Sequence, residues 1–176
     1  MMKNIILIVF IIFTLSCKAQ TVYPLGTSDI VESSFYVKDI NNHHDDIIGV
    51  WRWENGNDSF EITLQEFEMY SDIITPNEYY DRIFGKYVYI ENGETIAEVD
   101  TIQTFTNQKV SFIYKSPTEY IVFIRDVISD TYKSGEFILT SSTTATLTLR
   151  NSEGVKVNYG NGENFSLPTN ITLIKQ

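Results

Sequence analysis

The sequence predicts an all-β protein, a single antiparallel meander that closes into a β-barrel of about eight to ten strands, with little helix outside a signal peptide. Aromatic residues make up 14% of the chain, with eleven Tyr and eleven Phe, and these types favour strands. Apolar and polar side chains alternate in many short runs, as expected of strands with one buried face. Turn residues separate neighbouring runs, and helices do not alternate with them, so a parallel α/β fold is disfavoured.

The clearest element is a hairpin over residues 47–67, which turns at Asn55-Gly56. Trp51 and Trp53 share one face of its first strand, because strand side chains alternate. In its second strand the apolar residues change from even to odd positions after Leu64. A β-bulge at residues 65–66 is expected, which would put Phe67 and Met69 on the dry face.

The remaining strands follow from the same alternation. A helical turn is expected at residues 75–78, and Gly85 indicates a kink or a close backbone approach. Tyr87 and Tyr89 are expected on the outer face of their strand. Continuous turns favour a barrel over a sandwich, since closure removes unpaired edges. Strands are expected at residues 35–37, 82–91, 94–99, 110–115, 120–126, 136–141, 144–150, 155–159 and 171–175.

The N-terminus reads as a secretory signal over residues 1–16, with Lys3 followed by a short apolar run. Leu15-Ser16-Cys17 resembles a bacterial lipobox, which implies that Cys17 becomes the acylated N-terminus of the mature protein. The alternatives are an uncleaved, buried Cys17 or a soluble secreted protein. We therefore expect a lipidated N-terminus and tether at residues 17–42, a barrel domain at 43–176, and an exported protein anchored to the cell envelope, at the outer membrane.

The charge of the chain limits its partners. Lys and Arg number 13 against 23 Asp and Glu, for a net charge of −10. An acidic surface disfavours nucleic acid, whose phosphates need cationic side chains, and also direct adhesion to anionic lipid headgroups. The membrane is thus expected as a partner only through the N-terminal lipid. With Cys17 the single cysteine, no intramolecular disulfide forms.

Two groups of residues are weak candidates for a site. His43-His44-Asp45-Asp46 offers zinc-ligand chemistry, but neighbours on an extended chain point to opposite sides, so we expect a polar loop or a capped turn that enters the strand, and no metal. Trp51 and Trp53 could line a ligand cavity; the alternative, which we favour, is that both fill the core. Ligand-binding residues are otherwise unknown.

No catalytic pattern is present. The only histidines are His43 and His44, ahead of the barrel, so a serine or threonine nucleophile lacks a base. An acylated Cys17 is no nucleophile, and the sequence has no phosphate-binding glycine loop or metalloprotease motif. We expect neither enzymatic activity nor a cofactor, with an unrecognised active site as a distant alternative.

Gly49-Val50-Trp51 resembles the G-x-W signature of lipocalin-like barrels, a resemblance that implies a Trp closing one barrel end. More widely, the chain resembles an uncharacterised family of small lipoproteins of Bacteroidota-type bacteria, which has no assigned activity. His43-His44 departs from that pattern, where an acidic-apolar pair is expected before Asp45. The resembling segments are residues 17–20, 23–25, 38–42, 49–51, 85–87 and 167–173.

Two functions follow as expectations. The first is an envelope-anchored binding or interaction module whose barrel holds a small apolar ligand, as barrels of this size can. The alternative is a structural envelope protein with a solid barrel that contacts other proteins. A cavity of several hundred Å³ lined by aromatic residues would favour the first, and a filled interior with an exposed apolar patch the second.

The lipobox generates a direct prediction. A Cys17→Ser protein is expected to leave the membrane fraction, because no acyl chains remain to anchor it. Metabolic labelling of cells with a fatty-acid probe should mark the wild-type protein and not the variant. An unlabelled wild-type protein would contradict the anchor.

Overall fold

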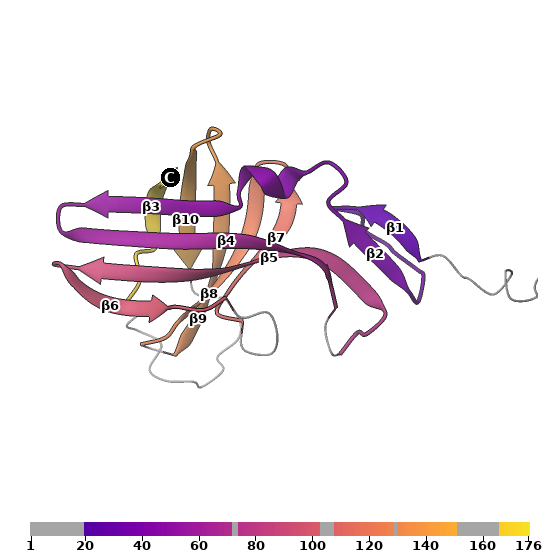
Figure 1. Ribbon diagram of the computed structural model, residues 1–176, viewed down its shortest axis with the longest axis horizontal. Coiled ribbons are helices and arrows are strands. Elements are labelled where there is room, and N and C mark those ends of the chain that lie inside the picture. Colours follow the sequence, from indigo (N-terminus) through magenta and orange to yellow (C-terminus); the bar gives the residue numbers. More distant parts are fainter. Residues whose placement is uncertain (1–19, 72–73, 103–107, 129, 151–165) are drawn as a thin grey trace, which may run out of the picture.

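The computed structural model describes residues 20–71, 74–102, 108–128, 130–150 and 166–176, and this part of the chain is all-β (Figure 1). The one helical element in it is a 3₁₀ turn, η1 (His43–Asp46). The strands are β1 (Thr21–Pro24), β2 (Phe35–Lys38), β3 (Gly49–Asn55), β4 (Asp58–Tyr70), β5 (Glu78–Glu91), β6 (Glu94–Val99), β7 (Val110–Ser116), β8 (Glu119–Asp126), β9 (Thr131–Leu139), β10 (Thr144–Arg150) and β11 (Asn170–Lys175).

Eight antiparallel strands close into a barrel in the order β3-β4-β5-β7-β8-β9-β10-β11. Two short pairings complete the circle. Ile174 of β11 lies opposite Arg52 of β3, and Ile83 of β5 lies opposite Phe112 of β7. The predicted fold class is confirmed, and it follows from local turns, because most neighbours in the barrel are also neighbours along the chain.

Three strands, β1, β2 and β6, extend the sheet outside the barrel. One edge of β5 pairs first with β2 at Glu78–Tyr80, then with the barrel strand β7 at Ile83 and Phe84, and then with β6 from Tyr87 onward. β2 runs parallel to β5, and β1 runs parallel to β2. These two strands lie beyond one end of the barrel (Figure 1). The short strand expected at residues 35–37 is present, whereas β1 lies within the stretch expected to be a tether.

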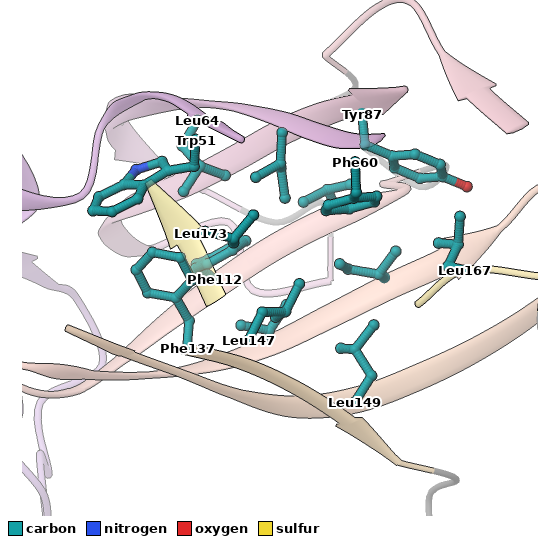
Figure 2. Packing of buried hydrophobic residues seen from close by; sticks show 14 of the residues in the cluster. Trp51, Phe60, Leu64, Tyr87, Phe112, Phe137, Leu147, Leu149, Leu167 and Leu173 are labelled. Atoms are coloured by element: carbon teal, nitrogen blue, oxygen red, sulfur yellow. The ribbon is translucent and has the colours of Figure 1, made fainter. Parts of the chain in front are cut away.

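The barrel interior is filled by large side chains (Figure 2). Trp51, Phe112 and Phe137 are almost fully buried. Phe137 packs edge to face against both Trp51 and Phe112, with ring centroids 5.2 and 5.4 Å apart. Phe60 stacks on Tyr87 further along at 5.8 Å. Each such buried side chain contributes about 1.5–3 kcal/mol through removal from water, so the interior serves stability.

The inward and outward faces differ from expectation in two strands. On β4 the register shifts between Phe67 and Tyr70, not at residues 65–66, so Glu66 keeps the side of Leu64. Phe67 instead packs outside the barrel on Phe84, with centroids 5.5 Å apart. Met69, expected on the dry face, is exposed.

The other corrections concern β5 and its approach. Tyr87 and Tyr89 are buried on the inner face, because both faces of this strand carry apolar residues and alternation alone could not orient it. Residues 75–78 form a turn closed by the Glu78 N–H donating to the Thr75 carbonyl at 3.1 Å, and not a helical turn. The strand predicted at residues 155–159 and Cys17 lie outside the described residues.

Gly85 meets the expectation of a close approach. A Cβ built there would lie 2.8 Å from the backbone oxygen of Thr63 and 2.9 Å from the Leu64 side chain. Any larger residue would therefore push β4 and β5 apart. This contact explains a glycine inside a long strand, a position where it is otherwise unfavourable.

Tyr87 makes stability depend on pH in alkaline solution. Its hydroxyl donates to the Arg125 carbonyl at 2.9 Å and accepts from the Val127 N–H at 3.3 Å, and burial raises its pKa to about 12. The unfolded chain loses this proton near pH 10, so the free energy of unfolding is expected to fall as pH rises from 10 towards 12. In Tyr87→Phe this fall should be smaller, with a loss of about 1–2 kcal/mol at neutral pH from the missing hydrogen bonds. Urea unfolding followed by tryptophan fluorescence from pH 8 to 12 measures both effects; equal alkaline slopes in the two proteins would contradict the assignment.

Candidate functional site

One end of the barrel is covered by η1, which the barrel strands hold through its carbonyl groups. The Trp51 indole N–H donates to the Ile47 carbonyl at 2.7 Å, and the Tyr120 hydroxyl donates to the His43 carbonyl at 2.9 Å. Lys175 Nζ donates to the Asp46 carbonyl at 2.8 Å. The Trp of the G-x-W motif thus lies at the end of the barrel that η1 closes.

A histidine and two carboxylates meet beneath this cover. His44 is only 2% exposed, and its Nδ1 lies 2.7 Å from Glu66 Oε1 and 3.8 Å from Asp39 Oδ2. Asp39 accepts the backbone N–H groups of His43 and His44 at 3.0 and 2.6 Å, which lack partners within a helical turn. Burial raises the pKa of the Glu66 carboxyl, His44 opposes this effect, and repulsion from Asp81 and Asp39 adds to it.

A third carboxylate, Asp81 of β5, joins the surrounding elements. It is 4% exposed and accepts three hydrogen bonds. These come from the Tyr36 hydroxyl at 2.5 Å, the Asp39 N–H at 2.8 Å and the Met69 N–H at 3.1 Å. Burial and the neighbouring Asp81 raise the pKa of the Tyr36 hydroxyl, so it remains a donor. Asp81 therefore ties β2, the approach to η1 and the irregular end of β4 to β5.

The cluster carries excess negative charge. Within the described residues, Asp39 and Glu66 form ion pairs only with His44, and no Lys or Arg pairs with Asp81. The carboxylates of Asp39 and Glu66 thus face one imidazole, and Asp81 adds a third negative charge beside Asp39. Burying charge without an opposite charge is costly, so this part of the protein favours a cation or a bound proton.

A pocket of about 510 Å³ opens where the sheet splits. β2 leaves the edge of β5 after Tyr80 and β7 joins it at Ile83, which leaves Asp81 and Arg82 between the two pairings. The loop from β1 to β2 forms the other side. The walls are Leu25, Gly26, Thr27, Ile30, Glu32, Phe35, Val37, Glu78, Tyr80, Asp81, Arg82, Phe112, Ile113 and Tyr114.

The walls combine apolar surface with charge. The Arg82 guanidinium lies over the Tyr80 ring at 4.5 Å, and the Tyr80 hydroxyl donates to Glu78 at 3.1 Å. Tyr114 stacks on His43 with centroids 5.3 Å apart. Since Asp81 belongs to the pocket wall and contacts Asp39, the pocket and the buried cluster adjoin.

The candidate site residues predicted from the sequence do not lie together in one site. Trp51 is fully buried and Trp53 is partly buried against the core, and neither belongs to the pocket wall. His43, His44 and the two aspartates after them form the 3₁₀ turn η1, and of these four residues only His44 belongs to a group of possible metal ligands in the described part of the chain. Sequence reasoning missed that His44 meets Asp39 and Glu66; the one local signal was Glu66, which interrupts the apolar alternation of its strand.

Comparison with known proteins gives a family without a function. The model of a family of unknown function, DUF6705, matches residues 2–176, so the chain belongs to this family. No curated protein and no solved structure matches the chain. In the described part of the chain, no helix has the length and apolar character needed to cross a membrane.

Asp81 should support the whole site. An Asp81→Asn variant is expected to lose about 2–4 kcal/mol of stability. The amide removes the charge that strengthens these hydrogen bonds, and its NH₂ group would face N–H or O–H groups that also donate. Urea unfolding measures this loss, and hydrogen exchange should show faster exchange at Tyr36 and Val37 of β2. The matched variant Asp100→Asn, at an exposed position, should stay within about 0.5 kcal/mol of wild type. Equal stability of the two variants would contradict the role of Asp81.

Proposed function

We propose that this DUF6705 protein is anchored to the bacterial envelope by lipid at Cys17 and binds a small amphipathic molecule in the pocket between β2 and β7, without chemical conversion. The barrel acts as a rigid scaffold, and the ligand lies beside it. Location and anchor rest on the lipobox-like segment, and the binding site rests on the pocket.

The pocket is the observation that carries this proposal. Its volume of about 510 Å³ falls within the roughly 300–1,000 Å³ usual for small-molecule sites. Its lining joins apolar and aromatic residues to three carboxylates and Arg82, which suits a ligand with an apolar body and a polar, cationic end. The filled barrel interior removes the support for an apolar ligand held by Trp51 and Trp53.

Chain length supports a site close to the membrane. Thr21, the first residue of β1, follows Cys17 by four residues, which span at most about 14 Å when extended. β1 leads directly into Leu25 and Gly26 of the pocket wall. A lipid at Cys17 would thus hold the pocket near the bilayer surface, where amphipathic molecules concentrate.

A second candidate is a solid barrel that contacts another protein. The filled interior favours it, and so does the outer face of β8, where Ile121 and Phe123 are 36% and 37% exposed. Ile121 lies opposite Ile113 of β7, which extends the apolar surface. Exposed apolar patches of this kind occur at protein interfaces.

Native mass spectrometry of the protein purified from its own host tests the first candidate. The wild-type protein is expected to carry a small-molecule adduct. Ile30→Trp should lose it, because the larger side chain fills the pocket. Val31→Trp is the matched control, since Val31 is 90% exposed and outside the pocket wall, and this variant should keep the adduct.

Two outcomes would overturn the proposed ligand site. An adduct that survives Ile30→Trp would lie elsewhere on the protein. A wild-type protein that co-purifies with a protein partner and carries no small molecule would favour the second candidate.

A further inference from the structure

We propose that Asp39, His44 and Glu66 form a binding site for a divalent transition metal of the zinc type. The three atoms that would bind the ion are Asp39 Oδ2, His44 Nδ1 and Glu66 Oε1. This inference uses only the buried cluster under η1, and it is independent of the proposed ligand in the pocket.

The geometry is close to that of a three-ligand centre. The three donor atoms lie within 4.8 Å of one another, with Nδ1 of His44 at 2.7 and 3.8 Å from the two carboxylate oxygens. Atoms bound at about 2.1 Å to one tetrahedral zinc ion lie about 3.4 Å apart. A separation of 4.8 Å, the upper limit among these three atoms, would therefore have to shorten by about 1.4 Å on binding, which rotation of the Glu66 side chain could supply.

The elements that supply the ligands differ in rigidity. Asp39 is fixed by two backbone N–H groups and His44 by its place in η1, so these two are held before an ion arrives. Glu66 has the longer side chain, which is 23% exposed. It provides both the adjustment in position and the contact with solvent through which an ion and a fourth, water ligand would enter.

Charge and ligand type identify the kind of ion. The cluster and Asp81 bring three carboxylates together, with a single imidazole and no Lys or Arg paired to them in the described residues. A divalent cation compensates more of this charge than an imidazolium does. An imidazole nitrogen with carboxylate oxygens suits zinc, whereas calcium and magnesium favour oxygen ligands alone.

Metal binding must displace the hydrogen that lies between His44 Nδ1 and Glu66 Oε1, which are 2.7 Å apart. Depending on the tautomer, this hydrogen moves to Nε2 of His44 or leaves to solvent. Protons compete with a metal for imidazole and carboxylate ligands, so the affinity should increase with pH.

Isothermal titration calorimetry with zinc chloride tests the site. The mature protein is purified without a histidine tag, treated with a chelator and titrated in two buffers of different ionisation enthalpy. We expect one ion per chain, and the difference in heat between the buffers gives the number of protons released on binding. Glu66→Gln and His44→Ala should each weaken binding at least about tenfold, since even losses of residues behind the ligands cost 10–100-fold.

Two controls separate this site from surface binding. His43→Ala removes the neighbouring histidine, which stacks on Tyr114, and Glu61→Gln removes an exposed carboxylate from the same strand; both should bind as wild type does. Thermal unfolding without metal establishes that Glu66→Gln is folded. Added zinc should then raise the midpoint of wild type and Glu61→Gln but not that of Glu66→Gln.

Three results would overturn the site. The wild-type protein shows no zinc binding, folded Glu66→Gln binds as tightly as wild type, or His43→Ala weakens binding as much as His44→Ala. Any of these would leave Asp39, His44 and Glu66 as a hydrogen-bonded support for η1 alone.

Discussion

The arrangement at the end of the barrel depends on one buried carboxylate, Asp81. It sits on β5 where the strand passes from pairing with β2 to pairing with β7, a point at which the sheet must either split or leave backbone groups unpaired. Its two oxygens accept donors from β2, from Asp39 and from the irregular end of β4. Hydrogen bonds to a charged acceptor are worth about 1.5–3 kcal/mol each, so this carboxylate can hold a short parallel extension that has little core of its own. The pocket and the histidine cluster exist because the extension stays attached here.

Because the barrel is closed and filled, a binding site has to lie at its end or on its outer side. An eight-stranded barrel has an interior just wide enough for side chains to fill, and Trp51, Phe112 and Phe137 fill it. The same closure leaves few free sheet edges. The surfaces that remain available are those that the N-terminal strands add, together with the outer face of β8. A solid barrel thereby favours recognition at its periphery over capture of a ligand inside.

Much of the fold follows from local sequence features, whereas the site does not. Alternation and turn residues predict the barrel strands, because each strand pairs mainly with its neighbour in the chain. The strand β2 is expected from its residues, but its parallel pairing with β5 is not, since β5 lies about 40 residues later. The strand β1, which pairs with β2, is not predicted. On β4, a β-bulge and a charged residue on the inner face interrupt the apolar alternation in the same way. The interruption at Glu66 comes from an inward-facing charge and not from a bulge. Asp39 and His44 are close along the chain, but Glu66 and Asp81 come from two other strands, β4 and β5, so no spacing along the chain indicates that these residues meet.

The position of Asp81 also connects the two proposals physically. It lies in the pocket wall, and its charge adds to burial in raising the pKa of the Glu66 carboxyl. Charges separated by buried protein are screened far less than charges in water. Excess negative charge behind the wall therefore favours a cationic group in the pocket, in line with the carboxylates of Glu32 and Glu78 beside it. A divalent ion held by Asp39, His44 and Glu66 would reduce that field and weaken a cationic ligand, although it touches no ligand atom. By reciprocity such a ligand would weaken the metal to the same degree, so the barrel end and the pocket would function as one electrostatic unit.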